Sequence, residues 1–165
     1  MPEKIANKLV VTTPSDLEIV LTRGFNAPRH LVFEASTKPE HVKNWWGLRS
    51  TKLISCEMDF RVGGSWRFVL LGPDGKEHVF KGVYHEIVVP ERIVSTECFD
   101  EPTVGSPEWQ VTTTYEERDG KTTLTSRCLH PSRENRDGHL QSGMEGGAGE
   151  TFDRLEELLA TLSVR

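Results

Sequence analysis

The sequence predicts an α+β domain in which a strongly curved antiparallel sheet wraps around one long C-terminal helix. Apolar and polar residues alternate over residues 51–129, turn residues interrupt this alternation at short intervals, and residues 144–162 carry an apolar stripe with helical spacing. A chain of 165 residues with 36% apolar and 27% charged residues is typical of one globular domain. We therefore expect a single domain over residues 16–165, preceded by an N-terminal extension over residues 1–15.

A first strand followed by two short helices is expected near the N-terminus. Residues 16–25 alternate apolar and polar side chains, as a half-buried strand does. Pro28 and Pro39 each suit the first turn of a helix, where a missing backbone N–H costs no hydrogen bond. Short helices are therefore predicted over residues 30–37 and 38–47, between the first and second strands.

Six further strands are expected between residues 51 and 129. The turns between them are marked by residue types that favour tight turns, namely Gly63-Gly64, Gly72-Pro73-Asp74-Gly75, Pro90-Glu91 and Asp119-Gly120. Residues 100–107 contain two prolines and a glycine and are expected to form a longer loop. Because short turns join most consecutive strands, the sheet is expected to be an antiparallel meander.

The C-terminal segment is predicted as one amphipathic helix over residues 144–162. Its first half is unusual, because Gly146, Gly147 and Gly149 surround Ala148. Each glycine lowers helix stability by up to about 1 kcal/mol relative to alanine. We expect either a roomier cavity beneath Ala148 or a frayed start of the helix, while simple tolerance of glycine at a helix end explains the pattern equally well.

Charge and composition argue against several classes of function. The net charge of -5 and the scattered basic residues disfavour binding of nucleic acid or anionic membranes. No apolar run approaches the roughly 18 residues that membrane insertion needs, and the N-terminus lacks a secretory signal, so a cytoplasmic location is expected. Cys56, Cys98 and Cys128 are widely separated and are expected to be buried, reduced thiols rather than disulfides or zinc ligands.

Several motifs occur in one known family and in the same order. They are Arg23-x-x-x-Ala27-Pro28, Pro39-Glu40-x-x-x-x-Trp45-Trp46-Gly47, Asp59-x-Arg61-x-Gly63-Gly64-x-Trp66, Gly82-x-Tyr84-x-x-Ile87-x-x-Pro90-x-Arg92-Ile93 and Asp153-Arg154-Leu155. On these motifs the chain resembles the activator of heat-shock protein 90 ATPase homologue family, a START-like branch of the SRPBCC superfamily. The resemblance implies a helix-grip fold, in which the long helix lies across a concave sheet and leaves a deep cavity for apolar small molecules.

The expected ligand site lies between the sheet and the C-terminal helix. Trp45 and Trp46 match the family's tryptophan pair near the pocket mouth. Adjacent helical residues point about 100° apart, so we expect one tryptophan in the core and the other toward the cavity or solvent. Bulky residues of the concave face would either fill the core or line a pocket, and both interpretations stay open. The candidate ligand-binding residues are Trp45, Trp46, Trp66, Phe68, Phe80, Tyr84, Trp109, Met144, Ala148 and Phe152.

The leading functional hypothesis is binding of a small hydrophobic molecule, such as a lipid, an aromatic compound or a polyketide, without turnover. No nucleophile elbow, phosphate-binding loop or metal-ligand spacing is found, so no catalytic residue, metal or cofactor is expected. The alternative is an enzyme of the polyketide cyclase or dehydratase kind, in which His78, His85 or Glu97 moves protons. That alternative requires a polar group that points into the cavity and has a shifted pKa.

Two kinds of protein partner are also considered. The family's name suggests a co-chaperone that binds heat-shock protein 90, and nothing else in the sequence indicates this partner. A homodimer is common for such domains, although no residue of this chain points to one.

Overall fold

The computed structural model describes residues 7–100 and 108–162 as eight strands and four helices. The strands are β1 (Val10–Thr12), β2 (Glu18–Phe25), β3 (Lys52–Met58), β4 (Ser65–Leu71), β5 (Glu77–Val88), β6 (Arg92–Phe99), β7 (Trp109–Arg118) and β8 (Lys121–Leu129). The helices are α1 (Arg29–Thr37), α2 (Pro39–Val42), α3 (Arg133–Gln141) and α4 (Met144–Leu162). These include the seven strands and three helices expected from the sequence, together with one further strand and one further helix.

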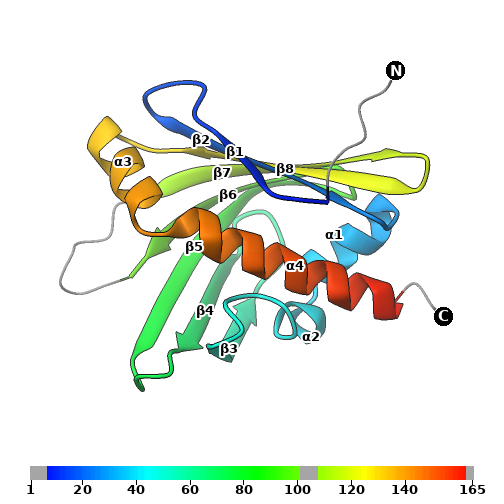
Figure 1. Ribbon diagram of the computed structural model, residues 1–165, viewed down its shortest axis with the longest axis horizontal. Coiled ribbons are helices and arrows are strands. Elements are labelled where there is room, and N and C mark those ends of the chain that lie inside the picture. The colour runs from blue at the N-terminus through cyan, green and yellow to red at the C-terminus, as the bar shows by residue number, and fades with distance from the viewer. Residues whose placement is uncertain (1–6, 101–107, 163–165) are drawn as a thin grey trace.

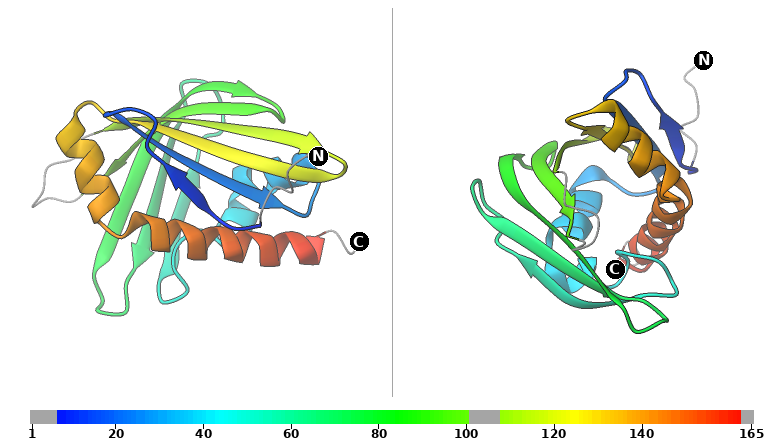
Figure 2. Two further views of the ribbon diagram at one scale, coloured as in Figure 1. Left: turned by 45° about the horizontal axis from the view of Figure 1, so that its top comes forward. Right: turned by 90° about the vertical axis from the view of Figure 1, so that its left-hand side faces the viewer.

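The strands form one antiparallel sheet in the order β1-β2-β8-β7-β6-β5-β4-β3. The sheet curls around α4, which lies across its concave face, while α1 and α2 close the same side (Figures 1 and 2). This arrangement confirms the helix-grip fold, with a curved antiparallel sheet, a long C-terminal helix and two short helices between β2 and β3. None of the helices in the described ranges is long and apolar enough to cross a membrane.

Two elements were not expected from the sequence. Strand β1 pairs with β2, with Val11 opposite Leu21, inside the segment expected to be an N-terminal extension. Three residues are too few to show a clear alternation. Helix α3 is strongly polar, so it lacks an apolar stripe, but it begins at an N-cap where the Ser132 hydroxyl accepts a hydrogen bond from the Asn135 backbone N–H at 3.1 Å. That cap was the available sequence signal for α3.

Helix α2 is shorter than the predicted segment 38–47. It ends at Val42, and the following residues continue as turns in which Trp45 and Trp46 both donate backbone hydrogen bonds to the Val42 carbonyl. The tryptophan pair therefore lies in a tight turn after the helix.

The regular pairing of the sheet is interrupted at β5. A register shift between Tyr84 and Glu86 marks an irregularity in the pairing of β5 with β6. Two residues earlier, a Cβ atom at Gly82 would overlap the Thr96 carbonyl oxygen and lie 2.6 Å from Trp66 Nε1. Glycine is thus needed for close approach of the two strands and for the placement of the Trp66 ring.

The core between sheet and helix consists of two apolar clusters. The main cluster lies under the second half of α4, where Leu155 and Leu159 are buried against residues such as Phe25 and Val32. The second cluster lies at the start of α4 and contains Ile19, Leu21, Trp109 and Cys128, with Met144, Ala148 and Leu140 packed against it. Both clusters bury apolar surface, which is the main favourable contribution to folding.

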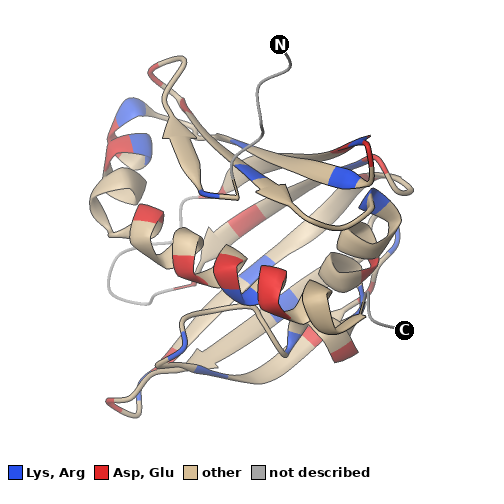
Figure 3. Ribbon diagram, turned by 45° about the vertical axis from the view of Figure 1, so that its right-hand side comes forward, with Lys and Arg blue, Asp and Glu red and all other residues tan. Residues whose placement is uncertain are grey.

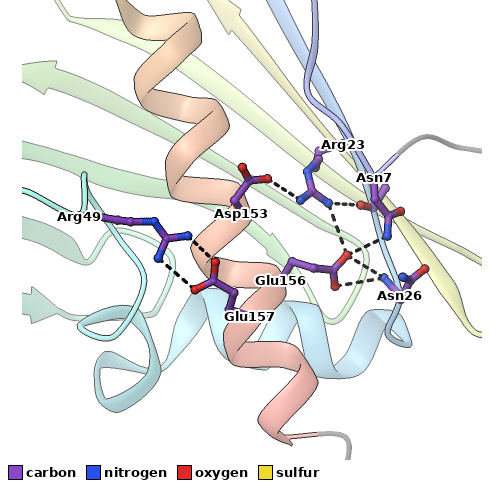
Figure 4. A network of polar contacts seen from close by, with 8 residues as sticks. Asn7, Arg23, Asn26, Arg49, Asp153, Glu156 and Glu157 are labelled. Atoms are coloured by element: carbon purple, nitrogen blue, oxygen red, sulfur yellow. Dashed lines mark hydrogen bonds and ion pairs between the residues drawn. The ribbon is translucent and has the colours of Figure 1, made fainter.

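Polar contacts attach the second half of α4 to the protein on two sides. Acidic residues recur along the helix (Figure 3), and Figure 4 shows three of them, Asp153, Glu156 and Glu157, in ion pairs. On one side, Arg23 of β2 contacts Asp153 and Glu156 at 2.9 and 3.5 Å. On the other side, Arg49 donates to Glu157 at 3.0 Å. The second half of the helix is therefore held in place from both flanks.

The first turns of α4 are attached differently. Among the described residues, no side chain between residues 144 and 150 forms an ion pair or hydrogen bond with another element. Their tertiary contacts are apolar, through Met144 and Ala148. A Cβ atom at Gly146 would meet nothing within 4 Å. The helix is continuous from Met144, so its start is not frayed, but it forms a thin cover over the second cluster.

Candidate functional site

The concave face of the sheet is formed by alternate residues of each strand. On β6 these include Ile93 and Ser95, which pair with Thr113 and Val111 of β7. The alternation continues without a shift along β6, so Glu97 is the next residue on this face. The concave face is thus mainly apolar, with a few hydroxyl groups and one carboxyl group among its residues.

A cavity of about 170 Å³ lies between the concave face and the α1–α2 segment. It is lined by Ser36, Val42, Trp45, Trp46, Met58, Trp66, Phe68, Tyr84, Ile93, Ser95, Thr113 and Tyr115. These residues come from α1, α2 and the turn that follows it, and strands β3 to β7. The lining is therefore rich in aromatic rings and includes several hydroxyl groups.

Half of the residues predicted for the ligand site line this cavity: Trp45, Trp46, Trp66, Phe68 and Tyr84. The other half lie elsewhere in the core. Phe80 packs edge-on against Trp46, and Phe152 packs edge-on against Phe25. Trp109, Met144 and Ala148 belong to the second cluster. The cavity thus lies beside the tryptophan pair. The roomier space that was one expectation for the region beneath Ala148 is a different location.

Three small polar residues of the cavity wall were not anticipated: Ser36, Ser95 and Thr113. Serine and threonine are as common on exposed strand faces as on cavity walls, so residue type carried no signal. The alternation of β6 and β7 could have placed Ser95 and Thr113 on the inner face. Ser36 comes from α1, and only the packing of that helix against β7 brings it to the cavity.

The two neighbouring tryptophans have different environments. Trp45 is buried and its Nε1 donates a hydrogen bond to the Ala35 carbonyl at 2.9 Å. Trp46 is half-buried and its ring lies edge-on to Phe68 and Phe80, with centroids 4.9 and 5.0 Å apart. Trp45 therefore fixes the turn in place, while Trp46 forms part of the aromatic wall of the cavity.

Two tyrosine hydroxyl groups give the cavity its polar character. Burial raises the pKa of Tyr115 to about 12, although the nearby Ser36 hydroxyl opposes this effect. Burial also raises the pKa of Tyr84, and the neighbouring Cys56 and Tyr115 act in the same direction. Both phenols are thus neutral at physiological pH. Among the described residues none forms a hydrogen bond with the Tyr84 hydroxyl, so it is available to a bound molecule.

Of the candidate proton-transfer groups, Glu97 and His78 lie on the concave face. The Glu97 side chain is half-buried, and burial alone raises its pKa to about 7. His85 is exposed, and His78 stacks on the ring of Phe99 with centroids 5.9 Å apart. Glu97 is therefore a carboxyl group on the inner face whose raised pKa suits proton transfer near neutral pH.

A histidine pair lies beside Trp109 in the second cluster. His130 Nε2 and His139 Nδ1 are 3.0 Å apart, and both rings pack against the Trp109 indole. Burial lowers the pKa of His130, and it lowers the pKa of His139 to about 4, so both are neutral at pH 7. Within the described ranges, Trp109 Nε1 and His130 Nδ1 are buried without hydrogen-bond partners.

A surface recess of about 410 Å³ lies between α2 and β3. It is lined by Pro39, Glu40, Lys43, Leu53, Ile54, Ser55 and Cys56. This recess is more open to solvent than the aromatic cavity, so a small apolar ligand would remain largely in water there. In the described part of the chain, no three His, Cys, Asp or Glu residues lie close enough together to hold a metal ion.

The curled sheet, the helix across it and the aromatic cavity between them define a protein of the START-like, helix-grip class. The family model described as "Activator of Hsp90 ATPase homolog 1-like protein" matches residues 26–160. The chain therefore belongs to this family, within the SRPBCC superfamily. Among curated protein sequences, none matches the chain.

Solved structures of bacterial proteins share the fold over nearly the whole chain. A protein from Rhodobacter sphaeroides is 25% identical, with a TM-score of 0.87 over 94% of this chain and 99% of that chain. One from Nitrosomonas europaea is 24% identical, with a TM-score of 0.82 over 93% of this chain and 100% of that chain. One from Staphylococcus epidermidis is 26% identical, with a TM-score of 0.76 over 92% of this chain and 94% of that chain. These likenesses establish the fold, which does not by itself define a ligand or reaction.

Proposed function

We propose that this protein binds a small apolar molecule containing one aromatic ring, in the cavity beside Trp45 and Trp46, without chemical turnover. The observation that carries this proposal is the partly open cavity of about 170 Å³ among aromatic side chains, whose lining includes Tyr84, a residue whose hydroxyl has no hydrogen-bond partner among the described residues. Aromatic walls favour edge-to-face contacts with a bound ring, and burial of the ring removes apolar surface from water.

The size of the cavity favours a compact ligand. An apolar cavity of about 150 Å³ is large enough to bind benzene, whereas pockets for larger ligands usually begin at about 300 Å³. A space of about 170 Å³ therefore suits a single substituted ring. A lipid or sterol would require the cavity to widen, for example by movement of the half-buried Trp46.

The Tyr84 hydroxyl supports selection among compact ligands. A neutral phenol can donate one hydrogen bond and accept others, so it complements a phenol or ketone on the ligand. A hydrogen bond of this kind contributes about 1 kcal/mol net. We therefore expect p-cresol to bind more tightly than toluene.

Calorimetric titration and thermal shift with toluene and p-cresol test the proposal. Binding to the folded state raises Tm in a concentration-dependent way. Thr113→Leu and Ser95→Leu fill the cavity and should abolish binding of both compounds. Tyr84→Phe should weaken p-cresol binding about fivefold to tenfold and leave toluene binding unchanged.

Thr112→Leu is the matched control, because this substitution is one residue from Thr113 on the outer face of β7. It should leave binding as in the wild type. The absence of a Tm shift with either compound would overturn the proposal. Equal binding by the Thr113→Leu and Thr112→Leu variants would show that the ligand occupies another place.

A second candidate function is proton transfer of the polyketide cyclase or dehydratase kind. It is favoured by Glu97, because burial raises the pKa of this concave-face carboxyl to about 7, where general acid–base catalysis is efficient. The test is incubation with a linear poly-β-ketone and detection of a dehydrated cyclic product by mass spectrometry. Formation of that product at the same rate by wild type and Glu97→Gln would exclude Glu97 from the reaction.

A further inference from the structure

Glu97 extends the wall of the aromatic cavity toward the start of α4. Ser95, which lines the cavity, and Glu97 lie on the same face of β6. Two residues along a strand span about 7 Å, so the Glu97 carboxyl belongs to the next row of side chains. Its partner across the β6–β7 pairing is Trp109 of the second cluster. Glu97 therefore stands between the cavity and the second cluster.

The Glu97 carboxyl has no partner within the described part of the chain. No hydrogen bond or ion pair from these residues reaches it, and burial is the sole cause of its raised pKa. Its side chain is half-buried, so water still reaches it. A carboxyl group that is removed from bulk water is normally paired, because an isolated buried charge is strongly disfavoured. A ligand could supply this missing partner with a group that pairs with the carboxylate.

One positive charge acts near this end of the concave face: Arg136 of α3 contributes to the lowered pKa of His130, and its guanidinium group is paired with Asp137 at 2.9 Å. The imidazole of His78 also lies on this face, stacked on the ring of Phe99. The pKa of His139 is lowered to about 4 and that of His130 is also lowered, so both imidazoles are neutral. Burial raises the pKa of Cys128 to about 12, with Glu97 contributing, so this thiol is neutral too. From α4, Met144 and Ala148 face the cluster and carry no charge.

Aromatic side chains flank the carboxyl on its own face of the sheet. Trp109 lies directly across from Glu97, and Phe99 is the next residue of that face along β6. The faces of aromatic rings attract cations. Above them lies the start of α4, which packs on the second cluster through Met144 and Ala148. A carboxyl group between aromatic rings under a thin cover suits an organic ammonium group.

We propose that Glu97 binds the amino group of the ligand, so that the site takes an arylalkylamine whose ring fills the cavity and whose nitrogen pairs with the Glu97 carboxylate. This inference rests on the proposed function, because the ring must occupy the cavity. The spacing of about 7 Å between neighbouring rows of side chains corresponds to a chain of about four carbon atoms between ring and nitrogen. A charge-assisted hydrogen bond holds the ammonium group, and the protein's net charge of -5 favours the approach of cations.

The test compares 4-phenylbutylamine with 4-phenylbutan-1-ol, which has the same shape and no charge. We expect the amine to bind wild-type protein at least tenfold more tightly than the alcohol at pH 8. The advantage should shrink as the pH falls to 6, because Glu97 becomes protonated. Glu97→Gln should reduce the ratio of the two affinities to about one and leave the affinity for the alcohol unchanged. Glu116→Gln, which removes an exposed carboxyl from the outer face of β7, should keep the full ratio.

The outcomes separate this inference from the proposed function. If the alcohol binds and the amine binds no more tightly, the role of Glu97 is overturned while the cavity remains the ligand site. If neither compound binds while p-cresol does, the inference fails and the proposed function stands, whereas failure of all three compounds to bind overturns both. An amine preference that persists in Glu97→Gln would also overturn the inference, because the ammonium group would then have another partner. The pH titration of the wild type tests the same point without a substitution.

Discussion

Arg23 Nη2 donates to Asp153 Oδ1 at 2.9 Å and thereby joins the sheet to the long helix. The arginine side chain is 3% exposed, whereas that of its aspartate partner is 61% exposed. The guanidinium group also lies over the ring of Phe25, 4.7 Å from its centroid. A buried cation of this kind needs a negative partner, so Asp153 holds the second half of α4 against β2.

Removal of the charge of Asp153 should therefore destabilise the fold more than removal of the charge of Glu157. In Asp153→Asn, the buried Arg23 retains only Glu156 as an ionic partner, so we expect a loss of about 1–2 kcal/mol of unfolding free energy. Glu157→Gln breaks an ion pair whose side chains are both more than half exposed, and should cost clearly less unfolding free energy because solvent screens the pair. Urea denaturation of the two variants measures both values. Equal losses would contradict the anchoring role of Arg23.

Gly82→Ala should destabilise the sheet strongly. The added methyl group would overlap the Thr96 carbonyl oxygen and press on Trp66, so the strands must separate. We expect a loss of about 3 kcal/mol or more, since backbone atoms cannot move as cheaply as side-chain ends. Gly138→Ala in α3 is the control, because a Cβ atom there meets nothing within 4 Å. That change should raise stability by up to about 1 kcal/mol through better helix propensity. Thermal unfolding that showed no loss for Gly82→Ala would contradict the close approach of β5 and β6.

Glu97→Gln should stabilise the protein at pH 8. The folded-state pKa of Glu97 is raised from its ordinary 4.5 to about 7, so the folded state binds more protons than the unfolded state between these values. Stability is therefore lost as the pH rises through this window. The variant, which stays neutral, should gain about 2 kcal/mol over wild type at pH 8 and show no gain from this effect near pH 4. Chemical denaturation at several pH values measures the difference, and a gain that did not change with pH would contradict the assigned pKa.

His139 should impose the opposite pH dependence. Its folded-state pKa is lowered from 6.5 to about 4, so the unfolded state binds more protons between these values and stability falls as the pH falls. In His139→Gln, the unfolding free energy should change less steeply between pH 6.5 and 4 than in the wild type. Losing the contact with His130 also changes the unfolding free energy itself. The two proteins are therefore compared by the slope of unfolding free energy against pH and not by absolute stability. An unchanged slope would mean that His139 is protonated in the folded protein.

Native cysteines should react slowly with a thiol reagent at pH 7.5. Burial raises the pKa of Cys128 to about 12 and that of Cys56 to about 11, and the thiolate is the reactive form. We expect labelling of Cys128 only at the rate of unfolding, with faster labelling of the half-buried Cys56. Peptide mapping after timed labelling distinguishes the sites. Rapid labelling of Cys128 in the folded protein would show that the second cluster opens.

The parts of the fold that could be predicted are those whose sequence pattern lies within a short stretch of neighbouring residues. The strands from β2 to β8 and helix α4 were predicted because alternation, turn residues and the helical stripe are properties of neighbouring residues. Strand β1 was missed because three residues carry no readable period, and its pairing with Leu21 decides its conformation. Helix α2 was predicted too long, since the Trp45 hydrogen bond to Ala35 belongs to a tight turn that no helical pattern reveals.

The candidate site was less predictable. The large aromatic residues were chosen for their size, and five of the eight line the cavity, whereas Ser36, Ser95 and Thr113 gave no signal. Glu97 was named beside His78 and His85 without a means of ranking them. The difference between these groups arises from desolvation, which depends on side chains brought together from other strands and from α4.

The sequence by itself determined the order of the elements, the antiparallel connections and the amphipathic character of α4, because periodicity and turn chemistry act over a few residues. It left open whether the concave face was packed solid or hollow. Only the tertiary structure decided that a space of about 170 Å³ remains beside the tryptophan pair, and that no described residue pairs with Glu97 in the adjoining row of side chains. The physical reason is that a cavity is the small difference between the volume enclosed by the backbone and the volume of side chains contributed by distant parts of the chain.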